Sequence, residues 1–378
     1  MLSLINQTQL PSKPEYAGLG STFGIDLDLL RDWQTEWLTT YDWNQDEAYI
    51  NKFHHFTTTI EDLDIHFIHH QSPCPDAIPI ILLHGWPGPF LEFLPVIEEL
   101  AGPKQDVCGN GTSFHVVVPS LPGFAFSSIP PENWLIDDTA RVFNTLMADV
   151  LVYQTFAVHG TDWGSSVGFS LYSNFNQTVR ADHMSFLPFF ALLPEELVAR
   201  NISLESPLEQ AEEDITVAWL SQGQSDGSAY YYEHTTRAKT IGLALQDNPV
   251  GQLAWMGEKF VNWSDPRAGT GPSVLNSTEI LRSVSLYFLT ESFTSSIFIY
   301  AQSPNGFTRE YYKAQTDAPF LFSAFKYNFF FFPAALVKEY TNLTSYKNHD
   351  FGGHFPGLDN PAALVEDIRD IGNFWYDN

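Results

Sequence analysis

Short, unbroken hydrophobic runs recur through the middle of this chain. Two of them are residues 78–84 (IPIILLH) and 115–119 (HVVVP), and the segments Leu151–Val158 and His183–Phe190 continue the series. A run of this length that ends near Gly or Pro is typical of a strand buried on both faces, as in a parallel sheet. We therefore predict strands at these four places.

Segments with helical spacing of hydrophobic residues lie between the runs. They are Pro89–Leu100, Ile136–Leu151 and a small-residue segment at Ser165–Leu171. Strands and helices that alternate at these intervals suit right-handed crossovers between parallel strands. The pattern predicts an α/β fold with a mostly parallel sheet and helices on both faces.

The alternation stops after the fourth run and resumes about ninety residues later. Residues 193–280 are polar and largely helical, which is typical of a lid inserted over the sheet. The helices expected in this lid are Glu195–Ala199, Leu208–Ser221, Tyr230–Gln246 and Gly251–Trp263. After it we expect the helix Ile280–Tyr300, the strand Phe320–Phe325, the helix Ala334–Tyr340, the strand Leu343–Tyr346, the loop His349–Pro356 and the closing helix Pro361–Phe374.

The first 75 residues are interpreted as an arm or cap rather than as a separate domain. Leu27–Leu38 and Glu47–Phe53 have helical spacing, and Phe56–Ile60 and Ile65–Ile68 alternate as strands. The domain boundaries expected are 1–75 for the N-terminal arm, 76–192 for the first part of the core, 193–280 for the helical lid and 281–378 for the second part of the core.

Composition and charge narrow the classes of function. The 378 residues are 44% hydrophobic, which is ample for a large core. A formal net charge of -27 repels phosphate backbones and anionic lipid, so we do not expect nucleic acid as a partner. No hydrophobic run reaches the roughly 18 residues of a membrane span. The run Phe329–Leu336 is shorter and contains Pro333.

Signals for the cellular compartment conflict. No basic segment followed by an apolar one stands at Met1–Gly20, so the sequence shows no signal peptide. Strong acidity and seven N-x-S/T sequons favour a secreted glycoprotein over a cytoplasmic protein. Cys74 and Cys108 each precede an expected strand and are compatible with a disulfide or with two unpaired thiols. The sequons stand at Asn6, Asn110, Asn176, Asn201, Asn262, Asn276 and Asn342.

The stretch FAVHGTDWGSSVG, residues 156–168, joins the end of an expected strand to a Gly-rich turn and a helix. This is the setting of a nucleophile elbow, where small residues on either side of the nucleophile permit a strained bend. Asp162 occupies the position that Ser usually holds. A carboxylate there can attack carbon directly and form an alkyl ester. The stretch alone leaves open a plainer interpretation, a turn in which a surface Asp162 caps the helix.

A candidate base lies late in the chain. His354 follows two glycines in the loop after the last expected strand, and a base downstream of the nucleophile fits the order of this fold. Taken alone, such a histidine is more often structural. The elbow upstream makes a catalytic role the favoured hypothesis.

Four segments carry a family resemblance. They are FTTTIEDLDIHFIHH (56–70), HGWPG (84–88), GTDWGS (160–165) and GGHF (352–355), in order and over nearly the whole chain. Together they resemble the microsomal-type epoxide hydrolases of the α/β-hydrolase superfamily. The resemblance implies the α/β-hydrolase fold with an N-terminal arm and a helical lid, and an enzyme without a cofactor. It also implies a small apolar epoxide as substrate, opened to a vicinal diol through a covalent ester.

The resemblance further implies roles for single residues. Asp162 matches the nucleophile that forms the ester, and His354 matches the base that activates water. The backbone N–H groups of Trp86 and Trp163 match the oxyanion hole.

Tyr230 and Tyr300 match the two lid tyrosines that hydrogen-bond the epoxide oxygen and protonate it. A phenol suits this task because it stays protonated near neutral pH and can give its proton to a developing alkoxide. Tyr231 and Tyr232 adjoin the first tyrosine, so a shift of that assignment stays open. Without the resemblance, each tyrosine is interpreted as a packing residue.

One position departs from the family pattern. Alignment of Phe322–Phe325 with the penultimate strand places Asn328 where the family has the carboxylate that orients the base. Asn can accept a hydrogen bond from imidazole but has no charge to stabilise imidazolium, and the corresponding Asp-to-Asn change in serine proteases costs about 10⁴ in rate. Asp350 and Glu339 are the nearest carboxylates in sequence, and whether Asn328 or Asp350 supports His354 stays open. The substitution threatens ester hydrolysis more than ester formation.

Other functions remain open at this point. One is a diverged relative that hydrolyses slowly or directs an intramolecular opening or rearrangement; another is a non-catalytic binding protein. A haloalkane dehalogenase also uses Asp, but HGWPG and the two tyrosines disfavour it. A metal site at His66, His69 and His70 is not expected, because no carboxylate–His spacing accompanies them. We expect no cofactor, and a homodimer is compatible with the sequence.

Overall fold

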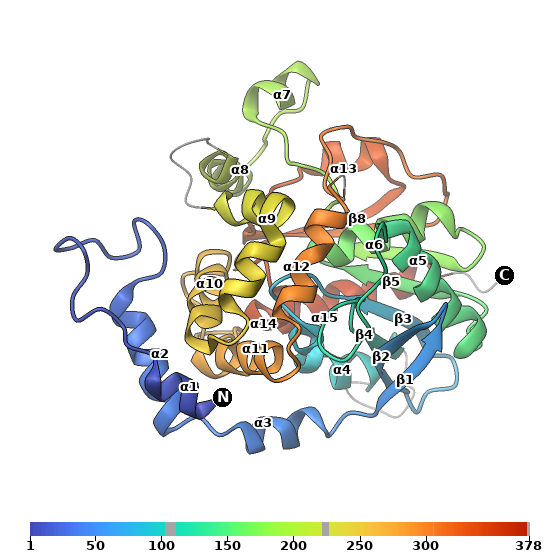
Figure 1. Ribbon diagram of the computed structural model, residues 1–378. Coiled ribbons are helices and arrows are strands. Elements are labelled where there is room, and N and C mark those ends of the chain that lie inside the picture. Colours follow the sequence, from blue (N-terminus) through green and yellow to red (C-terminus); the bar gives the residue numbers. More distant parts are fainter. Residues whose placement is uncertain (103–110, 221–226, 305, 376–378) are drawn as a thin grey trace.

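A single mixed sheet forms the centre of the computed structural model, which describes residues 1–102, 111–220, 227–304 and 306–375 (Figure 1). Within these residues the sheet has eight strands in the order β1-β2-β4-β3-β5-β6-β7-β8. Strands β3 to β8 run parallel, while β1 and β2 form an antiparallel hairpin that joins β4 at one edge. The strands are β1 His55–Ile60, β2 Leu63–His70, β3 Ile78–Leu83, β4 Phe114–Pro119, β5 Phe156–Gly160, β6 Val179–Met184, β7 Phe320–Tyr327 and β8 Leu343–Gly353.

Helices cover both faces of the sheet, because the central strands are hydrophobic on both sides. In β3, Ile80 and Leu82 pack toward α4 and α15, while Ile81 and Leu83 face the core shared with α5, α6 and the lid helices. This arrangement confirms the expected α/β-hydrolase fold. The covering helices are α4 Leu94–Ala101, α5 Ile136–Thr145, α6 Asp162–Asn174, α13 Ala334–Tyr340, α14 Pro356–Asp359 and α15 Pro361–Arg369, with short helical turns at Phe90–Phe93, Leu146–Val150 and Asp370–Asn373.

Four helices follow β6 in the segment predicted to form the lid. They are α7 Pro194–Ala199, α8 Pro207–Leu220, α9 Ala229–Leu245 and α10 Pro249–Asn262. In Figure 1, α9 and α12 (Phe293–Gln302) lie side by side. The division of the chain into arm, core and lid stays a prediction, but the helix positions within the lid match it closely.

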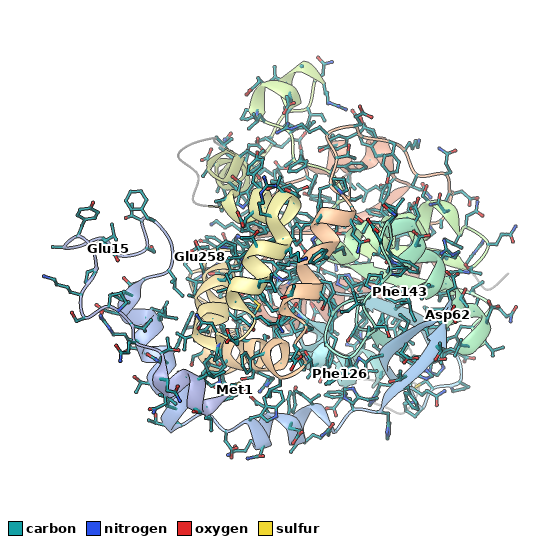
Figure 2. All side chains as sticks on the ribbon, viewed as in Figure 1. Met1, Glu15, Asp62, Phe126, Phe143 and Glu258 are labelled. Atoms are coloured by element: carbon teal, nitrogen blue, oxygen red, sulfur yellow. The ribbon has the colours of Figure 1, made fainter. Side chains whose placement is uncertain are left out.

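The N-terminal segment runs along the outside of the molecule to the β1–β2 hairpin (Figure 1). Its helices are α1 Leu2–Gln7, α2 Leu27–Thr39 and α3 Trp43–Ile50, and they pack against α10 and α11. Trp37 is fully buried there and donates from Nε1 to the Ser285 hydroxyl at 3.1 Å. The loop around Glu15, between α1 and α2, projects away from the body (Figure 2).

Two of the predicted strands are wrong in extent. The strand predicted at Leu151–Val158 begins only at Phe156, because the chain turns through Val152 at φ 61 after α5. The strand predicted at His183–Phe190 is instead β6, Val179–Met184. Beyond the carboxyl edge of the sheet the chain leaves the ladder, and Phe186 and Phe189 are buried there, while Phe190 is partly exposed.

Two predictions in the C-terminal part are also wrong. The helix predicted at Ile280–Tyr300 is two helices, α11 Ser277–Leu289 and α12 Phe293–Gln302, because Glu291 adopts φ 56 between them and a left-handed residue ends a helix. The loop predicted at His349–Pro356 is largely strand, since β8 continues to Gly353 beside Tyr327 of β7.

Three features bear on the cellular compartment: membrane-spanning helices, the two cysteines and the sequons. Within the described ranges, no helix combines the length and the hydrophobicity that crossing a membrane requires. Cys108 and the sequon at Asn110 lie outside the described residues, so the disulfide stays a prediction. The six described sequon asparagines are all exposed, and their glycosylation also stays a prediction.

Candidate active site

Asp162 sits at a strained bend between β5 and α6. Its φ is 47, a left-handed value that a residue with a side chain rarely adopts. The bend is tight because α6 approaches the strand closely: a Cβ on Gly160 would lie 2.6 Å from the Gly164 carbonyl oxygen, and a Cβ on Gly164 would lie 1.9 Å from that of Leu83. Asp162 is only 4% exposed, and Thr161 is the cap of the helix. The plainer interpretation of Asp162 as a surface cap is therefore wrong.

The HGWPG loop holds one oxygen of this carboxylate. The backbone N–H of Trp86 donates to Asp162 Oδ1 at 2.7 Å. Gly85 permits the approach, because a Cβ there would lie 2.1 Å from the same oxygen. The Trp86 N–H is thus directed at a carboxylate oxygen, as an oxyanion hole requires, and its role there stays a prediction. The matching role of the Trp163 N–H stays a prediction, although Trp163 directly follows Asp162 at the start of α6.

His354 directly follows β8 and faces Asp162. Its Nε2 lies 3.3 Å from Asp162 Oδ2 without hydrogen-bond geometry, and its Nδ1 lies 2.9 Å from Asn328 Oδ1. The Asn328 amide donates through Nδ2 to the Ser185 carbonyl at 3.0 Å, so its oxygen must face the imidazole. His354 therefore donates from Nδ1, which leaves the lone pair of Nε2 toward the nucleophile.

The alternative partners of His354 lie elsewhere. Asp350 has a side chain that is 62% exposed and pairs with Lys326 at 2.7 Å and with Arg267 at 3.5 Å. Glu339 pairs with Arg200 on the surface. Among the candidates named from the sequence, Asn328 is thus the side chain that contacts the base, and this neutral amide stands where a carboxylate was expected.

Tyr230 on α9 and Tyr300 on α12 lie above the elbow. The Tyr230 ring stacks on the Trp86 ring with centroids 5.6 Å apart, and the Tyr300 ring meets the Trp163 ring edge-on at 4.8 Å. The two phenol rings are 5.9 Å apart, and both residues are buried. Burial raises the pKa of both phenols well above the ordinary value, and the negative Asp162 contributes. Both hydroxyls are therefore donors at neutral pH.

The adjacent tyrosines of α9 are placed differently. Tyr231 is half-buried, and Tyr232 is 58% exposed. Of the three, Tyr230 is the one whose ring stacks on Trp86, and its role as the first lid tyrosine stays a prediction. A small aromatic cavity lies beside it and Asp162; its lining is Asp162, Phe186, Phe190, Trp219, Tyr230, Tyr231, Phe307, Phe329 and Phe330.

His234 is part of this cluster and was missed from the sequence. It is fully buried, with its ring 4.7 Å from that of Trp86 and 4.8 Å from that of Tyr300. Its Nε2 accepts from Trp255 Nε1 at 3.0 Å, and burial followed by the nearby Lys259 charge lowers its pKa to about 3. The only signal for it was its position one helical turn after Tyr230, on the same face of the predicted helix.

His66 of the N-terminal hairpin makes polar contacts with two neighbouring side chains. His66 Nε2 lies 2.8 Å from His55 Nδ1, and His66 Nδ1 lies 2.8 Å from the Ser120 hydroxyl. In the described part of the chain, no three His, Cys, Asp or Glu side chains gather in a way that could hold a metal ion.

Comparison with known proteins identifies the family of this chain. Residues 1–93 match the family described as "Epoxide hydrolase N terminus", and residues 78–202 match the alpha/beta hydrolase fold. The chain is 31% identical to Epoxide hydrolase 1 of Sus scrofa over 368 residues, which are 92% of this chain and 80% of that protein.

Solved structures agree with the sequence match. The Aspergillus niger epoxide hydrolase has 34% identity and a TM-score of 0.83, with 99% of this chain and 92% of that chain covered. The juvenile hormone epoxide hydrolase from the silkworm Bombyx mori has 25% identity and a TM-score of 0.84, with 99% and 91% covered. The chain therefore belongs to the microsomal-type epoxide hydrolase family of the α/β-hydrolase superfamily.

Proposed function

We propose that this protein hydrolyses an epoxide to a vicinal diol through an ester on Asp162. The observation that carries the proposal is the convergence, in one buried aromatic pocket, of a carboxylate at a strained elbow, a backbone N–H on one of its oxygens and two protonated phenols. The relatives named above are epoxide hydrolases, and members of this family need no cofactor.

In the first step, an Asp162 oxygen attacks a carbon of the epoxide and the carbon–oxygen bond of the ring breaks. The electron pair moves to the ring oxygen, which takes a proton from Tyr230 or Tyr300. Burial of these phenols keeps their protons in place until the alkoxide develops. The product is a β-hydroxyalkyl ester of Asp162.

In the second step, His354 Nε2 takes a proton from water and the resulting hydroxide attacks Cγ of Asp162. The Trp86 N–H, with that of Trp163, stabilises the tetrahedral oxyanion. The bond between Cγ and the alkylated oxygen then breaks, and the departing alkoxide takes the proton held by His354 to give the diol. The proton left on the Asp162 carboxyl group returns to the ionised tyrosine, which restores the enzyme. The 3.3 Å separation of His354 Nε2 from Asp162 Oδ2 suits a base that acts on water attacking Cγ.

The aromatic lining favours a small apolar epoxide as substrate. Phe186, Phe329 and Phe330 supply apolar surface and no charge, so binding rests on burial rather than on ion pairs. The diverged alternative, slow hydrolysis or a rearrangement, rests on Asn328 alone. It differs from the proposal in the fate of the ester.

The test is a single turnover of styrene oxide in isotopically labelled water. We expect one labelled oxygen in the Asp162 side chain, and we expect Asp162→Ala to lose turnover by about 10³-fold or more. Turnover without label in Asp162 would remove the covalent mechanism. An ester that forms and persists without hydrolysis would favour the diverged alternative.

A further inference from the structure

His354 must carry a positive charge during ester hydrolysis, and its partner Asn328 is neutral. The imidazole is 1% exposed and is surrounded by rings: Phe329 at 4.5 Å, Trp263 at 5.2 Å and Phe186 at 5.4 Å between centroids. A buried cation without a nearby negative charge is costly. The structure therefore raises the question of which carboxyl group balances it.

The lid helix α8 docks on the segment that carries Asn328. The backbone N–H of Phe331 donates to Thr216 Oγ1 at 2.8 Å, and the Trp219 ring stacks on that of Phe329 at 5.0 Å. Glu212 precedes these two residues by four and seven positions, so it lies on the same face of α8. The helix thus presents a carboxyl group to the neighbourhood of Asn328.

Glu212 and Asn328 line one small cavity together with Ser185. Glu212 is 1% exposed, and its Oε2 accepts from Asn348 Nδ2 at 2.7 Å. Its Oε1 and the Ser185 hydroxyl have no hydrogen-bond partner among the described residues. Buried polar atoms without partners are rare in native proteins, and two of them around one cavity indicate a polar role there.

We propose that Glu212 is a positioning residue for the catalytic base, supplying through Asn328 the negative charge that stabilises protonated His354. The inference rests on the proposed function, because only ester hydrolysis protonates His354. It assigns to the lid a function in the second chemical step, in addition to covering the substrate.

The charged groups around Glu212 influence the pH at which its carboxyl group ionises. Glu209 on the same helix, Asp350 and Tyr346 on β8, and Lys326 on β7 face it. Burial raises the pKa of Glu212 to about 8, while the hydrogen bond from Asn348 opposes the rise. The carboxyl group therefore ionises as pH passes through the mildly alkaline range, and ester hydrolysis gains rate over that range.

The test compares Glu212→Gln with Glu213→Gln by rapid quench of the styrene oxide ester. Glu213 is the matched control because it is also buried on α8 with a pKa raised to about 7 by burial, but does not line the cavity. We expect Glu212→Gln to slow ester hydrolysis by about tenfold near pH 8, to leave ester formation unchanged and to remove the rise of hydrolysis with pH. Glu213→Gln should behave as the wild type.

A second comparison introduces Glu212→Gln into the Asn328→Asp variant. Asn328→Asp places a charge directly beside His354, so Glu212→Gln should have little further effect in that background. An equal loss in both backgrounds, an equal loss in Glu213→Gln, or no loss in Glu212→Gln would overturn the proposal. Absence of any Asp162 ester in the wild type would instead count against the proposed function itself.

Discussion

Two buried histidines of this protein have opposite electrostatic surroundings. On the face covered by α4 and α15, His183 Nε2 lies 2.9 Å from the Ser323 hydroxyl, which donates to Asp367 at 2.5 Å. At the carboxyl edge of the sheet, His354 contacts only the amide of Asn328 on its Nδ1 side. The complete histidine–carboxylate relay therefore lies away from the candidate active site, and the histidine of that site has the neutral partner.

The difference follows from what each histidine must do. Asp367 is also bound by His349 at 2.6 Å and Lys347 at 2.9 Å, so its charge is already balanced. Burial lowers the pKa of His183 to about 4, and this histidine stays neutral. Hydrogen-bonded groups whose charges are already balanced can stabilise the fold without a change of protonation. A base that gains and loses a proton needs a partner whose charge is not already committed.

Removal of His354 should produce the largest effect. His354→Gln deletes the base but keeps Asp162 and both tyrosines, so the ester forms and accumulates. We expect turnover of styrene oxide to fall by about 10²–10⁴-fold. Mass spectrometry of the intact protein should detect the alkylated enzyme, and a variant that turns over without accumulating ester would contradict the assignment.

Asp367, on the face of the sheet covered by α4 and α15, should contribute to the stability of the fold and not to turnover. Burial opposes ionisation of Asp367, but hydrogen bonds from His349 and Ser323 and the nearby His183 lower its pKa to about 2. Because this value lies below the ordinary one, the carboxylate stabilises the fold above about pH 4, and that contribution is lost as pH falls toward 2.

Asp367→Asn should therefore lower the free energy of unfolding by about 1–3 kcal/mol at pH 7 and flatten its dependence on pH below 4. Urea denaturation at several pH values measures both effects. Turnover per folded molecule should remain at the wild-type level. A selective loss of ester hydrolysis would show that the relay also serves the chemistry.

Asp350 should give the smallest effect, although it lies only four residues before His354. Its exposed ion pairs with Lys326 and Arg267 are worth little in water. Asp350→Asn should leave the rate of ester hydrolysis near pH 8 within about twofold of the wild type. A loss comparable to that of Glu212→Gln would mean that Asp350 supports the base.

The candidate site residues that are recognisable in the sequence share a local cause. The elbow, the HGWPG loop and His354 are recognisable because glycines are required at fixed offsets where no Cβ fits. Tyr230 and Tyr300, in contrast, were singled out only by the family resemblance. The mostly parallel sheet and the helices on its two faces followed from hydrophobic runs, which encode burial on both faces.

The features that escaped prediction depend on contacts between distant segments. His183, Ser323 and Asp367 meet only because β6, β7 and α15 are neighbours in space. The break between α11 and α12 depends on a single left-handed residue, Glu291, for which the sequence offers no Gly signal. Glu212 and Asn328 line one cavity only because α8 packs on the segment after β7.

The hydrogen bond from Trp86 to Asp162 Oδ1 makes the two oxygens of the nucleophile chemically distinct. In the proposed mechanism Oδ1 is held by the loop, so Oδ2 is the oxygen that attacks and later departs in the diol. Water replaces only that oxygen, and Oδ1 remains with the enzyme as long as the carboxylate does not rotate. Each active site then loses one of its own oxygen atoms in its first turnover and none afterwards. The water-derived oxygen that replaces it distinguishes an enzyme molecule that has turned over from one that has not.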